Sequence, residues 1–574
     1  FEIFGISFKG GIEFIPTGLN PEQWRDPSLW AKWTDVQGIE AVIVTQWKMM
    51  RVPLDHIIPY PDYTPDPLNP ALKTGLIVLQ EPGWKNANVF LDSTTLEPGI
   101  WSFWQVTRFE NAYAFLDEPG EWYLDKNTGW LYYIPRPGED MATAEVELPI
   151  LDVLVEGVGD LEHPVSNIRF EGLTFSHATW FGPNSANGYV ADQSGFHLVG
   201  EDHGFNIIGH DKNVVRTPGN VRFQFARNIT FRGNIFEHLG GVGLDFDTGS
   251  QSNAIESNLF EDISSAAIQL GGVSEVDHHP QDPGQVTANN VISNNLIRGA
   301  GRDYVDAAGI FIGFTQHTLI SHNTIVDVPW SGIAMGWGWG LLDPGGYPGV
   351  PGATRGEWGL YTTPTPNQGN KILNNRIHSF LNALWDGGAV YTTGYQGTSL
   401  TDGLLIQGNV ASDKRPEAGG NTFYTDGGSR YVQLQGNVSL DNPQGVTFLV
   451  PPPNPDDPLP YSSTPSKLNG IPYGSDKGGC RTYGDISFVV NYWLNPCFFD
   501  ICPYSENGVS YPTNMISRLN KDIEGEADVP KSLLRAPGAR KRPVSIPAHR
   551  RVLPPLGAST PPTEGIPPAP NCQY

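Results

Sequence analysis

Two aspartates in this chain, Asp386 and Asp426, are each followed directly by a pair of glycines. Glycine lets the backbone bend sharply and lets a ligand approach closely. Two carboxylates about 5–10 Å apart can act together on a glycosidic bond, as acid plus nucleophile or acid plus base. A single aspartate in such a turn more often caps its own backbone. The matched settings nevertheless favour a catalytic pair, and spacing near ~5.5 Å would give retention of configuration, the outcome favoured here.

Other acidic residues fall in comparable places. Asp306 opens DAAGIFIG (306–313) as Asp386 opens DGGAVYTT (386–393), so Asp306 is a third catalytic candidate. A group of acids raises the pKa of one member by repulsion between like charges, which suits a general acid. Asp245 and Asp247 are two apart and share one face of a strand. Asp247 is a candidate substrate contact, and the two could instead hold a structural calcium ion. We expect no other cofactor.

Aromatic residues accompany these acids and indicate a carbohydrate-binding wall. Three tryptophans lie in PWSGIAMGWGWG (329–340), at Trp330, Trp337 and Trp339. Trp337 and Trp339 alternate with glycines, which are poor core partners, so we expect both indoles to be exposed. Tyr391 closely follows Asp386 and belongs to the same expected wall. His317 is a candidate for hydrogen bonds to the substrate.

A repeated pattern identifies the scaffold that must position these side chains. Seven short segments place an apolar residue three positions before an asparagine and another apolar residue soon after it. Such recurrence is typical of a coil that stacks on itself and buries its apolar positions in one core. The asparagines can then form a ladder inside the turns. They are Asn234, Asn258, Asn295, Asn323, Asn375, Asn409 and Asn437.

The fold class that follows is all-β, with a right-handed parallel β-helix over residues 161–450. FEGLTF (170–175) has the same register with Leu173 in place of asparagine, as expected of a first coil. A second apolar strand follows several of the asparagine segments, for example AAGIFI (307–312). Longer intervals are loops at the edge of the coil, where function usually resides.

The rest of the chain departs from this pattern. Residues 1–160 contain short alternating segments and a hairpin at 121–135, which predict an antiparallel β-domain, a barrel or a sandwich. Residues 451–574 are Pro-rich at their start and contain all the cysteines. We expect this region to be irregular and to pack on the helix.

Composition narrows the possible classes of function. The chain has 574 residues and a formal net charge of -25, which argues against nucleic acids and anionic membranes as partners. No apolar run is long enough to span a membrane. The even number of cysteines predicts two disulfides in a secreted, monomeric protein, and two sequons begin at Asn228 and Asn437. The cysteines are Cys480, Cys497, Cys502 and Cys572.

Several of these segments resemble one family of enzymes. The run at 309–340, the segment at 386–394 and the hairpin WYLDKNTGWLYYIP (122–135) are similar to the β-helix enzymes of glycoside hydrolase family 141. The resemblance implies hydrolysis of plant cell-wall glycans, with xylanase and α-L-fucosidase activities. It also implies a catalytic pair of aspartates, which map to Asp386 and Asp426. Members often carry a further acid after the second aspartate, where this chain has Gly427.

Three classes of function therefore remain. The favoured one is a xylan-type glycoside hydrolase, with α-L-fucosidase activity on complex glycans as the alternative substrate assignment. A polysaccharide lyase would use calcium and an arginine or lysine base, yet few basic residues lie near the acids. The third class is a non-catalytic carbohydrate-binding helix.

Overall fold

The computed structural model describes most of the two regions that the sequence predicts to be folded. The described residues are 33–45, 47–58, 76–88, 106–200, 214–340, 342–344, 361–415, 421–426, 428–440, 486–494 and 526–539, with short strands at 2–3, 6–7, 11–13, 473–475, 505–506, 509–510, 515–518 and 521–523. The four cysteines and the Pro-rich stretch 451–472 lie outside these residues, so the disulfides stay a prediction.

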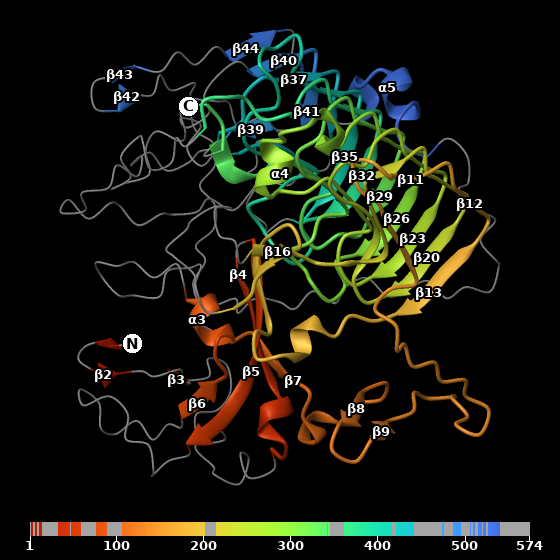
Figure 1. Cartoon of the computed structure of the whole chain (residues 1–574), viewed down its shortest axis with the longest axis vertical. Helices are drawn as coiled ribbons and strands as arrows, with labels where there is room; N and C mark the ends of the chain where they lie inside the picture. The colour runs from red at the N-terminus through yellow and green to blue at the C-terminus, as the bar shows by residue number, and fades with distance from the viewer. Residues whose placement is uncertain are drawn as a thin grey trace. The chain divides into compact units, whose positions relative to one another are not determined.

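Three parallel sheets form the larger unit, and among the described residues each coil except the last contributes one strand to each sheet (Figure 1). The first sheet contains β10 (Val155–Val158), β17 (Gly219–Gln224), β21 (Val242–Phe246), β24 (Ile268–Leu270), β27 (Ile310–Ile312), β30 (Ile333–Met335), β33 (Val390–Thr392), β36 (Phe423–Thr425) and β39 (Tyr473–Ser475). The chain runs from this sheet to the second, then to the third, and back to the first. The architecture is the predicted parallel β-helix.

The other two sheets follow the same order along the coil. The second contains β12 (Arg169–Glu171), β19 (Thr230–Arg232), β22 (Ala254–Glu256), β25 (Val291–Ser293), β28 (Leu319–Ser321), β31 (Lys371–Leu373), β34 (Leu404–Gln407), β37 (Val432–Gln435), β40 (Ile486–Val489) and β44 (Met515–Arg518). The third contains β13 (Thr174–Ala178), β20 (Ile235–Leu239), β23 (Leu259–Ile263), β26 (Leu296–Ala300), β29 (Thr324–Val326), β32 (Arg376–Phe380), β35 (Val410–Lys414), β38 (Val438–Ser439), β41 (Tyr492–Leu494) and β45 (Lys521–Ile523). The coils thus continue past residue 450, the expected boundary.

The seven predicted asparagines form one continuous ladder at the corner between the second and third sheets, and all are fully buried. The Asn323 side-chain amide donates to Asn375 Oδ1 at 3.0 Å, and its backbone N–H donates to the same oxygen at 2.9 Å. Leu173 N–H donates to Asn234 Oδ1, which confirms the atypical first copy. Asn491, which we did not predict, adds a rung after Asn437.

The residue before each of the seven asparagines has a positive φ, between 54° and 66°. This left-handed conformation turns the chain sharply, and it is least costly for glycine and small polar residues. The sequence supplies such residues at nearly every rung. They are Gly233, Ser257, Asn294, His322, Asn374, Gly408 and Gly436. The repeat therefore encodes both the turn and the ladder that closes it.

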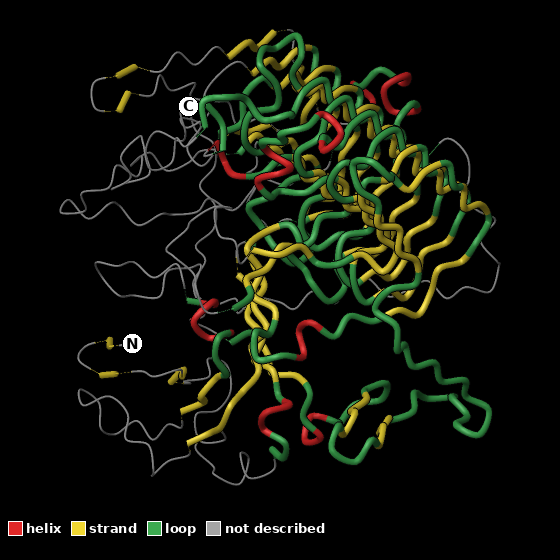
Figure 2. The backbone as a smooth tube through the Cα atoms, viewed as in Figure 1, coloured by secondary structure: helices red, strands yellow, loops and turns green. Residues whose placement is uncertain are grey.

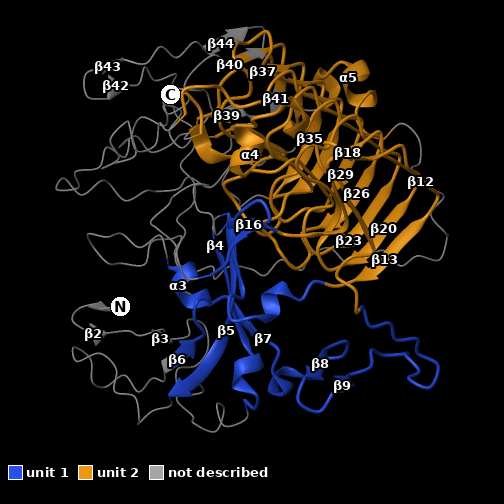
Figure 3. Ribbon diagram, viewed as in Figure 1, with its two compact units in different colours: residues 1–149, 180–216, 560–566 blue, residues 150–179, 217–559, 567–574 orange. Residues whose placement is uncertain are grey.

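The smaller unit is an antiparallel sheet that two separate stretches of chain build (Figure 3). Its strands include β4 (Glu40–Thr45), β5 (Lys48–Ile58), β6 (Leu76–Leu79), β7 (Arg108–Glu110), β14 (Tyr189–Gln193), β15 (Phe196–Leu198) and β16 (Val214–Arg216). The chain leaves the helix after its first coil, adds β14 to β5 and re-enters at β17. A single boundary at residue 160 does not describe this arrangement. β10, which belongs to the β-helix, lies before residue 160, and residues 180–216, which belong to the smaller unit, lie after it.

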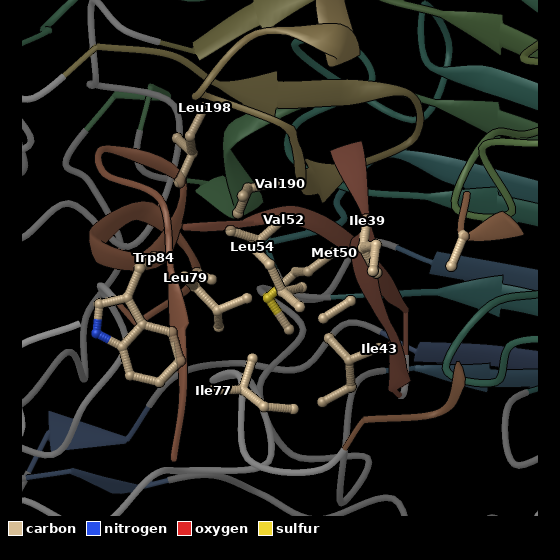
Figure 4. Close-up of a cluster of buried hydrophobic side chains, with 13 residues drawn as sticks. Ile39, Ile43, Met50, Val52, Leu54, Ile77, Leu79, Trp84, Val190 and Leu198 are labelled. Carbon is tan, nitrogen blue, oxygen red and sulfur yellow. The ribbon is translucent and has the colours of Figure 1, made fainter. Parts of the chain in front are cut away.

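The core of this unit and the short helices complete the fold. Figure 4 shows apolar side chains from β4, β5 and β6 converging with Val190 of β14, Leu198 of β15 and Trp84 of α3 (Gly83–Ala87). The predicted hairpin is present as β8 (Trp122–Asp125) and β9 (Trp130–Tyr133). Figure 2 shows mainly strands and loops, with short helices such as α4 (Glu275–His278) and α5 (Lys531–Arg535).

Candidate active site on the first sheet

The two aspartates of the predicted pair flank neighbouring strands of the first sheet. Asp386 lies at the corner before β33, and Asp426 directly follows β36, the next strand in the sheet. Both side chains are partly exposed. They therefore occupy opposite ends of adjacent strands, and whether both take part in catalysis stays a prediction.

Two tyrosines connect the aspartates across the sheet. Tyr391 of β33 and Tyr424 of β36 are paired in register, with ring centroids 5.4 Å apart at nearly a right angle. The Tyr424 hydroxyl donates to Asp386 Oδ1 at 3.1 Å, and the Tyr391 hydroxyl donates to Asp426 Oδ2. Each tyrosine thus donates a hydrogen bond to the aspartate of the neighbouring coil.

Tyr424 was not among the predicted site residues, although the sequence carries a signal for it. The segments VYT (390–392) and FYT (423–425) align strand for strand, so Tyr424 occupies the position of Tyr391 one coil later. Both tyrosines are almost fully buried, at 2% and 3% exposed. Their role at this site is therefore to hold the carboxylates through their hydroxyls, which differs from the expected stacking of Tyr391 on a sugar.

The corner that carries Asp386 has a strained and tightly packed backbone. Asp386 has a φ of 55°, and a side chain at Gly387 would approach Trp330 Nε1 to 2.5 Å. Trp330 donates from that nitrogen to the carbonyl oxygen of Trp385 at 3.1 Å. Trp330 is fully buried, so the prediction that it lines the wall is wrong. It supports the Asp386 corner from beneath.

Trp339 holds Asp426 from a loop that follows β30. Its indole Nε1 lies 3.1 Å from the Tyr391 hydroxyl oxygen and 3.2 Å from Asp426 Oδ2. The residue is partly exposed and left-handed, with a φ of 45°. A side chain at Gly428 would approach the Trp339 carbonyl carbon to 2.4 Å, so this glycine is what lets the loop lie on the strand end.

The predicted exposure of Trp337 is wrong. It is 1% exposed, and its ring packs edge-on to Phe311 of β27 and lies 5.3 Å from the ring of Trp339. Its neighbouring glycines do not mark a solvent-facing segment. Gly336 and Gly338 both have positive φ, and they let the backbone fold back so that the indole covers the sheet.

The remaining predicted residues lie on earlier coils. Asp306 takes the coil position of Asp386 before β27, two coils away, and is fully buried. At ~4.8 Å per coil its backbone is about 10 Å from that of Asp386. His317 is exposed on the corner after β27, and Asp247 follows β21, four coils before β33. The structure thus groups Asp386, Asp426, Tyr391 and Trp339, and leaves these three apart.

Two other acids near the strand ends have perturbed pKa values. Burial raises the pKa of Asp343 to about 7, against the lowering effect of hydrogen bonds from Tyr395 and Thr365. At Asp402 burial also acts to raise the pKa, but hydrogen bonds from Thr398, Ser399 and Gln368 outweigh it and lower the pKa to about 2. Among the described residues, no three or more His, Cys, Asp or Glu side chains are grouped to hold a metal ion.

The two sequons differ in accessibility. Asn228 is exposed, which is compatible with a glycan. Asn437 is fully buried, and its amide donates to Ile406 O at 2.9 Å and to Asn491 Oδ1 at 3.1 Å. A glycan at Asn437 is incompatible with this ladder, so that predicted site is wrong.

Comparisons with known proteins agree with the fold. A family model described as "Right handed beta helix region" matches residues 165–338, in agreement with the predicted hand. A solved structure described as a glycoside hydrolase has a TM-score of 0.61 at 21% identity, over 89% of this chain and 72% of that one. PfbA, a surface adhesin of Streptococcus pneumoniae, has a TM-score of 0.31 at 11% identity, over 61% and 69%, which carries no argument. No curated protein sequence matches. Within the described part of the chain, no helix is long and apolar enough to cross a membrane.

Proposed function

We propose that this chain is a glycoside hydrolase of the family 141 type that cleaves a neutral plant cell-wall polysaccharide, with xylan favoured. The observation that carries the proposal is the crossed pair of hydrogen bonds from Tyr424 to Asp386 and from Tyr391 to Asp426. These bonds hold two partly exposed carboxylates beside neighbouring strands of one sheet, and a pair of carboxyl groups is what glycosidic hydrolysis uses. The solved glycoside hydrolase of similar fold supports the class without deciding the substrate.

The two carboxylates have different surroundings, and this suggests different roles. Each carboxylate accepts a hydrogen bond from a tyrosine hydroxyl, and Asp426 accepts a further one from the Trp339 indole N–H, which adds stabilisation to a negative charge there. We assign Asp426 the role of the ionised group that activates water. Asp386 then protonates the oxygen of the leaving sugar. Trp339 lies beside Asp426, partly exposed, and is the aromatic residue best placed to contact a sugar ring.

The placement of the carboxylates favours inversion of configuration. They lie at opposite ends of neighbouring strands, and each reaches the tyrosine hydroxyl of the neighbouring coil, so we infer that the carboxyl groups are further apart than the ~4.8 Å between equivalent positions of adjacent coils. In this proposal a water molecule lies between the two carboxyl groups. Inverting enzymes separate their carboxyl groups by about 6.5–9.5 Å, and this proposal replaces the retention that coil spacing alone suggested.

A screen with product analysis tests the proposal. Purified protein is incubated with unsubstituted xylan, substituted xylans and fucosylated glycans, and both reducing ends and unsaturated products are measured. We expect new reducing ends without ultraviolet absorbance, largest on xylan. Released fucose would move the substrate to the α-L-fucosidase alternative. An unsaturated product would establish a lyase, and binding without any product would establish a carbohydrate-binding protein.

A further inference from the structure

The loop that carries Trp339 reaches across the ends of two later coils. We call residues 337–340 and 342–344 the Trp339 loop; it follows β30 and lies against glycines that follow β33 and β36. A side chain at Gly394 would come within 3.0 Å of the Trp337 carbonyl oxygen, and one at Gly428 within 2.4 Å of the Trp339 carbonyl carbon. The absence of a side chain at each of these glycines thus leaves space that the Trp339 loop occupies.

A buried acid fastens the far end of this loop. Asp343 is 2% exposed, and its Oδ2 accepts the backbone N–H of Tyr395 at 2.9 Å. Its Oδ1 accepts the Thr365 hydroxyl at 3.4 Å. Tyr395 lies four residues after Tyr391 on the same chain segment, as Asp343 lies four residues after Trp339. The acid therefore ties the Trp339 loop to the segment that supplies the other donor to Asp426.

We propose that Asp343 is a positioning residue for the proposed hydrolysis: by clamping the Trp339 loop to the end of β33, it sets the Trp339 indole N–H on Asp426. The inference depends on the proposed function for its consequence in catalysis, whereas the clamp itself can be tested without a substrate. The carboxyl of Asp343 binds Tyr395 and Thr365, not the proposed catalytic aspartates, so in this proposal its effect on catalysis passes through the position of Trp339.

The surroundings of Asp343 indicate that its shape matters more than its charge. Burial raises the pKa of the carboxyl to about 7, with Arg430 and the hydrogen bonds acting in the opposite direction. The site therefore tolerates a neutral group. An asparagine can keep both contacts, because its oxygen can accept from Tyr395 N–H and its amide can donate to the Thr365 hydroxyl. An alanine keeps neither.

The test compares Asp343→Ala, Asp343→Asn, Trp339→Phe and the double variant Asp343→Ala/Trp339→Phe. We expect Asp343→Ala and Trp339→Phe each to lower kcat by about tenfold or more, and Asp343→Asn to remain within about threefold of the parent. Because Asp343 acts through Trp339, the double variant should match Trp339→Phe within about twofold. Multiplied losses in the double variant, or an Asp343→Asn as poor as Asp343→Ala, would overturn the proposal.

A matched control variant distinguishes loss of the Asp343 contacts from a general loss of stability. A second measurement, hydrogen exchange, tests these contacts without a substrate. Asp402→Ala removes an acid that holds its own loop through Thr398 and Ser399, at 2.5 and 2.6 Å, and should leave kcat within about twofold. Hydrogen exchange over 336–344 should rise in Asp343→Ala and stay at the parent level in Asp343→Asn and Asp402→Ala. Unchanged exchange in Asp343→Ala would refute the clamp even where hydrolysis is observed.

Two outcomes need a further measurement. If the parent protein hydrolyses no glycan, the proposed function fails, and the exchange data alone decide whether the clamp exists. If Asp343→Ala does not fold, Thr365→Val replaces it, since that change removes one of the two donors to the carboxylate. We then expect kcat about threefold lower and faster exchange over 336–344, and parent values for both would overturn the proposal.

Discussion

Replacement of Asn375 by alanine should be among the most destabilising single changes in the coil. The Asn375 amide donates to Ile320 O and to Asn409 Oδ1, each at 3.0 Å. Its oxygen accepts two bonds from Asn323, at 2.9 and 3.0 Å. The two bonds that Asn375 donates contribute about 1 kcal/mol each, and the two buried donors left on Asn323 cost about 1–3 kcal/mol each, which gives roughly 4–8 kcal/mol in total. Against a typical stability of about 5–15 kcal/mol, this is a large loss.

Urea denaturation followed by circular dichroism measures this loss as a change in midpoint at constant slope. Asn228→Ala is the matched control, because Asn228 is an exposed corner asparagine whose amide donates to Asn167 Oδ1 at 2.6 Å. We expect the control to change the free energy of unfolding by less than about 1 kcal/mol. A loss below about 1 kcal/mol for Asn375→Ala as well would show that the ladder does not stabilise the coil as argued.

Other predictions address the site and the modifications. Tyr391→Phe should lower kcat about 10–100-fold in hydrolysis assays, because it removes a hydrogen bond to the charged Asp426 worth about 1.5–3 kcal/mol; near-parent kcat would exclude that role. The raised pKa of Asp343 means that the folded chain holds an extra proton, so stability should fall as pH rises from about 4 to about 7. Asp343→Asn should flatten that dependence of Tm, and an unchanged slope would contradict this. Mass spectrometry should find a glycan at Asn228 and none at Asn437, and a mass four hydrogens below the free-thiol value, for two disulfides among the four cysteines.

The scaffold could be predicted from the sequence because each coil repeats a local rule. The left-handed residue and the asparagine of each corner are adjacent in the sequence, as at Asn374 and Asn375. A few neighbouring residues therefore determine the corner. Register then follows, since strands of one sheet pair through the same positions of the pattern. The same local argument identified Leu173 as a ladder position without an asparagine.

Contacts between residues far apart in the sequence could not be predicted from these local patterns. Trp337 is buried because its loop crosses later coils. The residues near position 337 do not indicate the course of that loop. The smaller sheet takes β14 from a segment after the first coil, so the domain boundary depends on which strand pairs with β5. Asp306 matched Asp386 in sequence, but two intervening coil steps and full burial separate their environments.

The most direct test of the central claim is turnover of the best glycan substrate by Asp386→Asn and Asp426→Asn, each checked for parental folding by circular dichroism. Each change keeps the size of the side chain and removes a proton-transfer role, so we predict that kcat falls by at least about 10²-fold in both. Near-parent turnover in either variant would remove that residue from the mechanism. A loss confined to Asp306→Asn would contradict the account and move the catalytic group to the earlier coil.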